Sequence, residues 1–241
     1  MGNLPGSVRI VVRAIDEQER AARLLQAQGW AEELFAAIAK QAIRPGRTEL
    51  EVNRDCKALA AEMFGVTQHW HKRVIRSGPN TLQPYRENPP DRVIGEDDIV
   101  FVDLGPVFEK WEADVGRTYV LGDDPAKLRL RDDLEPVWQA GKAFFDARPD
   151  ITGQQLYARM QELAMERGWE FGGDIAGHLV GEFPHEKIAR DEWESYIAPR
   201  NERPMRGLDP TGRQLHWILE VHLVDRDRQI GGFHEQLLTL P

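Results

Sequence analysis

The sequence contains a single cysteine, no long apolar run and no surplus of basic side chains, and each shortage argues against a class of protein. Cys56 has no second cysteine for an internal disulfide, which fits a reducing cytoplasm, although a secreted protein poor in cysteine would look the same. No apolar stretch approaches the roughly 18 to 20 residues of a membrane span, and residues 1–25 carry no targeting pattern. With 31 basic against 40 acidic side chains, the net charge of −9 disfavours nucleic acid and anionic membranes as partners. We therefore expect a cytoplasmic protein.

An internal duplication organises the chain, which at 241 residues is long enough for one large domain or two small ones. Identities recur at one offset: Arg44-Pro45 with Arg148-Pro149, Thr48 with Thr152, Leu59-Ala60 with Leu163-Ala164, and Glu62 with Glu166. Both copies open with a capping box, the pattern of a helix start, in Thr48-x-x-Glu51 and Thr152-x-x-Gln155. We expect one domain over residues 1–241, built from repeats at about 16–122 and 124–240.

Each half is predicted to run in the order helix, helix, strands. Helices are expected over residues 16–43 and 125–147, and the helix after each capping box should end near Gly65 or Gly168, where glycine tolerates a left-handed cap. Apolar segments predict strands over 99–102 with 117–121, and over 217–224 with 233–240. Two such halves related by a pseudo-twofold axis would place a site at their junction.

Asp103 ends an apolar strand pattern, and Glu220 and Glu235 lie inside two others, where an ionised side chain is costly unless it is paired or binds a metal. A fourth carboxylate, Asp114, lies 11 residues after Asp103. Taken singly, each carboxylate could equally face solvent or form a salt bridge, and His178 could be an ordinary packed histidine. Oxygen-rich ligation suits Mn, Fe, Co or Zn, and two such ions can share a water and lower its pKa. The joint pattern predicts a two-metal site made by Asp103, Asp114, His178, Glu220 and Glu235.

These residues and the duplication resemble the pita-bread metallopeptidases, a family that includes methionine aminopeptidase, Xaa-Pro aminopeptidase, prolidase and creatinase. The resemblance extends over about residues 16–240 and implies an α+β pita-bread fold, with two pseudo-symmetric halves around a curved antiparallel sheet. It implies two divalent metal ions held by the five residues above. It further implies that Glu220 takes a proton from the bridging water and passes it to the leaving amine, while His185 contacts the substrate.

Two patterns are similar to the Xaa-Pro branch of the family, namely Asp114-x-x-Arg117-Thr118 and Ser77-Gly78-Pro79-Asn80. Members of that branch usually carry an N-terminal domain of their own, and we expect that domain to be absent here. They also place a histidine before a tyrosine, where this chain has Pro84 before Tyr85. His69 or His71 could replace that histidine from a neighbouring strand, because alternation would put both on one face with Arg73. Both could instead be surface or packing residues. The catalytic candidates are Glu220, His185, His71 and Tyr85.

The leading hypothesis is hydrolysis of a peptide or another small amide, closest to cleavage of short Xaa-Pro peptides by a dinuclear metal centre. Two alternatives stay open, a metalloenzyme of this fold that acts on a non-peptide small molecule, and a non-catalytic binding module. The expected partners are a short peptide or small amide, with no nucleic acid and no membrane. A homodimer is left open, because the apolar segments Trp30–Ile38 and Trp193–Ile197 could face a second copy or lie in the core.

Overall fold

The computed structural model describes residues 16–185 and 192–240, and over these ranges helices and strands follow the predicted order. The first half contains α1 (Glu17–Gln41), α2 (Glu49–Phe64), β1 (Val74–Ser77), the 3-10 helix η1 (Gly78–Leu82), β2 (Ile99–Leu104), β3 (Val107–Phe108), β4 (Trp111–Glu112) and β5 (Val115–Val120). The second half contains α3 (Pro125–Asp146), α4 (Gly153–Glu166), β6 (Glu170–Phe171), β7 (Leu179–Val180), the 3-10 helix η2 (Glu192–Ser195), β8 (His216–Asp225) and β9 (Ile230–Leu237).

Local hydrogen bonds explain where the paired helices begin and end. Thr48 Oγ1 accepts from the Glu51 amide at 3.2 Å, while the Glu51 carboxylate accepts from the Thr48 amide at 3.0 Å. Thr152 and Gln155 repeat this capping box at the start of α4. Gly65 ends α2 with a φ of 67°, a left-handed conformation that costs a residue with a side chain about 1–2 kcal/mol. The predicted helix boundaries are therefore confirmed to within a few residues.

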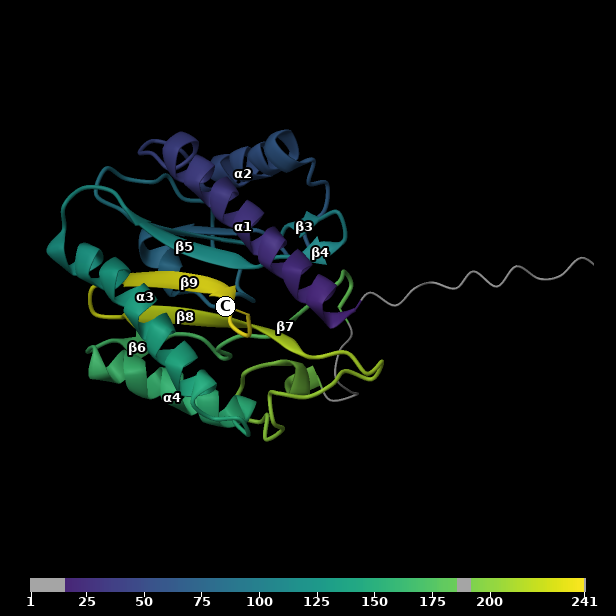
Figure 1. Cartoon of the computed structure of the whole chain (residues 1–241). Helices are drawn as coiled ribbons and strands as arrows, with labels where there is room; N and C mark the ends of the chain where they lie inside the picture. The colour runs from purple at the N-terminus through teal and green to yellow at the C-terminus, as the bar shows by residue number, and fades with distance from the viewer. Residues whose placement is uncertain (1–15, 186–191, 241) are drawn as a thin grey trace, which may run out of the picture.

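Seven of the strands form a sheet that joins the two halves, while β3 and β4 pair only with each other. Its order is β1-β2-β5-β9-β8-β6, with β7 also paired to β8, and every pairing is antiparallel. The α1–α2 pair lies beside the β1, β2 and β5 side of the sheet, whereas α3 and α4 lie beside β8, β9 and β6 (Figure 1). The β5–β9 contact is where the two halves meet, so residues on these strands and their neighbours face one junction.

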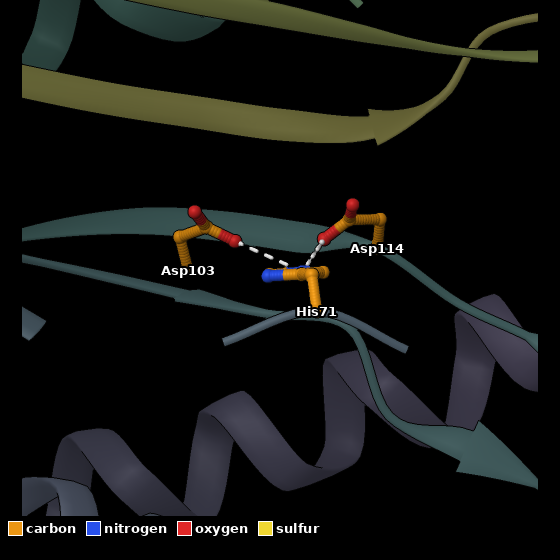
Figure 2. A group of neighbouring side chains, drawn as sticks. All are labelled: His71, Asp103 and Asp114. Carbon is orange, nitrogen blue, oxygen red and sulfur yellow. Dashed lines mark hydrogen bonds and ion pairs between the residues drawn. The ribbon is translucent and has the colours of Figure 1, made fainter. Parts of the chain in front are cut away.

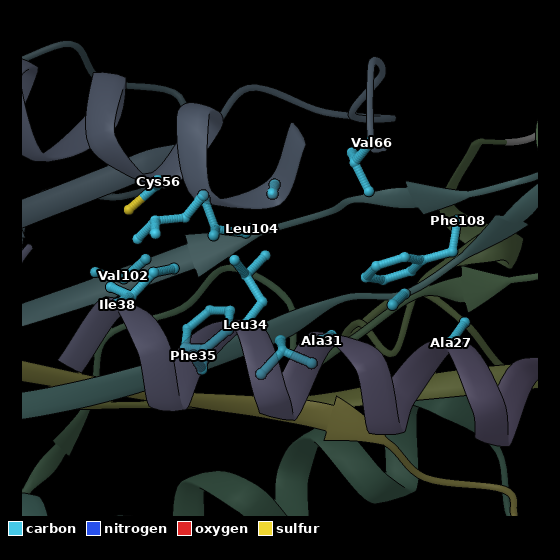
Figure 3. Close-up of a cluster of buried hydrophobic side chains, with 14 of the residues drawn as sticks. Ala27, Ala31, Leu34, Phe35, Ile38, Cys56, Val66, Val102, Leu104 and Phe108 are labelled. Carbon is cyan, nitrogen blue, oxygen red and sulfur yellow. The ribbon is translucent and has the colours of Figure 1, made fainter. Parts of the chain in front are cut away.

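Two apolar clusters stabilise the helix layers. In the first half, Leu34 and Ile38 of α1 are fully buried with Val102 and Leu104 of β2 (Figure 3). In the second half, α3 and α4 pack in the same way against β8 and β9 around the buried Trp217. Full burial of a large aliphatic side chain contributes about 1.5–3 kcal/mol, so these clusters hold the strands that carry the site.

The apolar segments considered for a dimer contact lie largely in the core. Leu34, Phe35 and Ile38 are buried within the first cluster, and Ile197 is buried within the second. Of the helices that the structure describes, none is both long enough and apolar enough to cross a membrane.

Candidate metal centre

Three of the predicted ligands lie in one row across four strands. Asp103 of β2 is opposite Gly116 of β5, Gly116 is opposite Glu235 of β9, and Glu235 is opposite Glu220 of β8. Residues directly opposite one another in an antiparallel sheet share a face, so the three carboxylates converge on that face. Gly116 adds no side chain to the row, and a Cβ there would lie 2.4 Å from the Phe233 ring and 3.1 Å from Glu235 Cβ.

The other two predicted ligands meet beside this row. Asp114 lies in the short link between β4 and β5, and its Oδ2 is 3.0 Å from His178 Nε2. The same His178 nitrogen lies 3.4 Å from Glu235 Oε1. His178 Nδ1 is 2.8 Å from the carbonyl oxygen of Leu179, which fixes the ring with Nε2 toward the two carboxylates.

His71 joins the site, and His69 does not. The expected strand alternation is wrong here, because β1 begins only at Val74 and the preceding segment makes just an isolated bridge between His69 and Pro106. His71 Nε2 lies 3.1 Å from Asp114 Oδ1 and 3.5 Å from Asp103 Oδ1, between the two carboxylates (Figure 2). Burial works against its charged form, but the charges of Asp114 and Asp103 raise the pKa of His71 to about 9.

Burial dominates the electrostatics of the carboxylates. It raises the pKa of Asp103 to about 7, raises that of Glu220 to about 8, and also raises the pKa of Glu235. Burial likewise opposes ionisation of Asp114, but the two neighbouring imidazoles outweigh it and lower the Asp114 pKa to about 2. Carboxylates gathered this closely need cations or shared protons to compensate their charge.

Unsatisfied oxygens in this cluster fit a metal. Asp103 Oδ1 and Glu220 Oε1 are buried and accept no hydrogen bond from the residues that the structure describes. A buried acceptor left without a partner costs about 1–3 kcal/mol, which a coordinated cation would remove. Two groups of side chains could each hold an ion, and both contain Asp114: one adds His71 and Asp103, the other His178 and Glu235. The donor set therefore fits divalent cations.

Glu112, which no sequence pattern singled out, orients His185. Glu112 is buried in β4, and its Oε2 lies 2.7 Å from His185 Nδ1. The same carboxylate accepts hydrogen bonds from the amides of Gly181 at 3.0 Å and His185 at 3.2 Å. His185 also borders a hollow of about 200 Å³. No local pattern could have identified this role, because its partner His185 lies 73 residues further along the chain.

Trp70 was also missed, although it connects the histidines. Its ring centroid lies 4.8 Å from that of His178 and 5.7 Å from that of His185, and it is 4.6 Å from that of the adjacent His71. Tyr85 lies at the edge of this group, about half exposed, with its ring 5.9 Å from the His71 ring. The Trp70 ring thus packs edge-to-face against the imidazoles of His71, His178 and His185.

Comparison with known sequences connects this geometry to a family. The model of metallopeptidase family M24 matches residues 22–207. A Xaa-Pro dipeptidase from Pyrococcus horikoshii is 30% identical over 155 residues, which are 64% of this chain and 42% of that protein. A putative Xaa-Pro aminopeptidase from Mycoplasma genitalium is 22% identical over 185 residues, 76% of this chain and 48% of that protein. The chain thus spans less than half the length of these curated relatives.

Solved structures show the same fold. A prolidase from Thermococcus sibiricus has a TM-score of 0.74 at 18% identity and covers 94% of this chain and 57% of that chain. A methionine aminopeptidase from Rickettsia prowazekii has a TM-score of 0.67 at 17% identity and covers 93% and 94% of the two chains. These likenesses confirm the α+β pita-bread fold. Because the family model covers most of the sequence, the chain belongs to metallopeptidase family M24.

Proposed function

We propose that the protein is a dinuclear metal-dependent hydrolase that cleaves short peptides, most closely those with proline in the second position. The convergence of Asp103, Asp114, His178, Glu220 and Glu235 on one face of the sheet carries this proposal. Because Asp114 belongs to both metal-binding groups, with one oxygen toward each, it is suited to lie between two ions. Mn, Co, Zn and Fe all suit such a set of ligands.

Divalent ions held by these residues would supply a water of lowered pKa and would polarise the scissile carbonyl. In the proposed reaction, Glu220 accepts the proton of the attacking water at its carboxylate and delivers it to the nitrogen of the leaving amine. His185, held by Glu112, steadies the substrate from the side of the Trp70 ring.

The preference for Xaa-Pro peptides is supported by the relatives and by the Ser77-Gly78-Pro79-Asn80 segment. The matched Pyrococcus horikoshii protein is a Xaa-Pro dipeptidase, although the chain covers only 42% of its length. Glu49 holds the segment in place, since its carboxylate accepts from the Ser77 amide at 2.6 Å and from Asn80 Nδ2 at 2.9 Å. Pro84 brings no side-chain donor or acceptor to the position where the branch has histidine.

The test is a cleavage assay on purified protein supplied with Mn²⁺, Co²⁺, Zn²⁺ or Fe²⁺. A panel of Xaa-Pro dipeptides and tripeptides is compared with matched peptides that have alanine in place of proline. Metal-dependent release of the N-terminal residue, faster for the proline series, supports the proposal. Bound metal without cleavage of any peptide contradicts it and favours a non-peptide amide substrate. A protein that binds no metal contradicts it in favour of a binding module.

A further inference from the structure

We propose that His71 is itself a ligand of the divalent ion held by Asp103 and Asp114, so that the centre contains two imidazoles instead of one. The inference rests on the proposed function and deepens it. Its basis is the position of His71 Nε2, which lies 3.1 Å from Asp114 Oδ1 and 3.5 Å from Asp103 Oδ1 (Figure 2). Among the described residues, Asp103 occurs in only one group that could hold an ion, and His71 is the third member of that group beside Asp114.

The hydrogen bonds of His71 direct a lone pair toward the ion. His71 Nδ1 lies 2.6 Å from the carbonyl oxygen of Lys72, and a carbonyl can only accept. Nδ1 therefore keeps its hydrogen, and release of the Nε2 proton on metal binding would leave Nε2 as the electron-pair donor. His178 has the same arrangement, with Nδ1 on the carbonyl of Leu179 and Nε2 on the other oxygen of Asp114. The two rings thus approach Asp114 in equivalent ways.

The two distances also distinguish a ligand from a simple hydrogen-bond donor. Donor atoms on neighbouring positions of an ion with bonds of about 2.1 Å lie about 3.0–3.5 Å apart. Both His71 distances fall in this range. A hydrogen bond accounts for the 3.1 Å contact with Asp114 but not for the 3.5 Å contact with Asp103, whose Oδ1 accepts no hydrogen bond from any described residue. An ion between the three atoms would satisfy them all.

Contacts of the neighbouring residues hold His71 in this position. The Trp70 amide donates to the carbonyl of Gly105 at 2.9 Å, and Trp70 Nε1 donates to the carbonyl of Ala113 at 3.3 Å. A Cβ at Gly105 would lie 2.2 Å from His71 Cδ2 and 2.4 Å from Trp70 Nε1, so only glycine leaves room for both rings. The side chain of His71 is only 8% exposed, so few water molecules can reach it and compete with it for the ion.

A second imidazole changes which metal the centre prefers. Imidazole is a borderline donor that suits Co²⁺ and Zn²⁺, whereas carboxylate and carbonyl oxygens suit Mn²⁺. His71 should therefore strengthen the binding of Co²⁺ more than that of Mn²⁺. Replacing it with glutamine, which can offer only an amide oxygen, should remove this preference while leaving an oxygen ligand in a similar place.

The experiment measures Co²⁺ and Mn²⁺ binding and the visible absorption of the Co²⁺-loaded protein. It compares the wild type, His71→Ala, His71→Gln and the matched control His69→Gln, all checked for folding by circular dichroism. His69 is in the same segment, but its Nε2 contacts no hydrogen-bond partner among the described residues. We expect both His71 variants to bind Co²⁺ at one position at least about tenfold more weakly with a changed spectrum. In His71→Gln, Mn²⁺ affinity should change less than Co²⁺ affinity.

Each outcome separates the inference from the proposed function. If the wild type binds two Co²⁺ ions and the His71 variants match His69→Gln in affinity and spectrum, His71 is no ligand, while the proposed hydrolase stands. If Co²⁺ and Mn²⁺ binding weaken equally and the spectrum is unchanged, the inference is also overturned, because His71 then only positions Asp114. A wild type that binds no ion contradicts the proposed function and the inference together.

Discussion

Asp114 is the residue on which the two halves of the site converge. One of its oxygens faces His71 from the first half, and the other faces His178 from the second. The charges of these imidazoles lower its pKa to about 2, so Asp114 is ionised whenever the protein is folded near neutral pH. Such a carboxylate needs no proton loss before it binds a cation.

Removing a carboxylate from the row should weaken metal binding strongly. Asp103→Ala and Glu235→Ala each delete a buried donor, and we expect metal affinity to fall by more than about 100-fold with loss of hydrolysis. Metal content after dialysis, measured by mass spectrometry, checks this result. Asp132→Ala, which removes an exposed carboxylate on α3, is the control and should keep both metal and activity. Unchanged turnover in both site variants would show that the ligands are assigned incorrectly.

Glu112 should affect substrate handling and leave the metals in place. Glu112→Gln weakens the 2.7 Å contact that orients His185, and we expect kcat/KM to fall about 10- to 100-fold with normal metal content. Steady-state kinetics beside metal analysis measure the two effects separately. Loss of metal in this variant, or full activity, contradicts a role for Glu112 in positioning His185.

Single residues also mark the limit of prediction from sequence. The sequence pattern singled out Asp103, Glu220 and Glu235, because a charged residue in or at the end of an apolar strand is unusual, and the fold brings these three side chains to one face of the sheet. Both His71 and His69 were candidates for the site, and sequence could not separate them. The backbone there is not a regular strand, so it directs the two side chains differently from strand alternation. Glu112 follows the charged residues Glu109 and Lys110, and its partner His185 is far along the chain, so only the fold brings the pair together.

At the scale of elements, the helices were the most predictable part. Their ends are set by local features, namely the capping boxes at Thr48 and Thr152 and the glycine after α2. Hydrogen bonds between residues close in sequence form these caps. The sheet order was less accessible, because the β5–β9 pairing joins segments more than a hundred residues apart. Apolar segments predicted β2 with β5 and β8 with β9, and the internal duplication predicted that the two halves meet at a junction.

The connection after β2 offers a test of how elements position the site. Gly105→Ala places a Cβ 2.2 Å from His71 Cδ2, and such overpacking should destabilise the protein by about 1–3 kcal/mol and weaken metal binding. Urea unfolding and metal titration measure the two losses. Gly29→Ala is the matched control, since a Cβ there meets no heavy atom within 4 Å and lies inside α1, where alanine should stabilise by about 0.5–1 kcal/mol. If Gly105→Ala behaves like Gly29→Ala, the tight contact does not exist.

Both halves contribute side chains to the proposed metal centre, so metal binding should stabilise the entire fold. The reactivity of Cys56 can measure this stabilisation. Burial raises the Cys56 pKa to about 12 and keeps the thiol from reacting in the folded state. We expect labelling by iodoacetamide to require unfolding. A divalent ion at 100 times its dissociation constant should then slow labelling about 100-fold. An unchanged labelling rate would mean that the first half opens independently of the metal centre.

We propose that this face of the sheet holds two divalent ions. Titration of the metal-free protein with Co²⁺, followed by calorimetry and by visible absorption, distinguishes two bound ions from one or none. We predict saturation at about two ions per chain, reduced in Asp103→Ala and almost lost in Asp114→Ala, since Asp114 contacts both groups. Saturation at one ion, or a wild-type titration that shows no binding, would contradict the dinuclear centre.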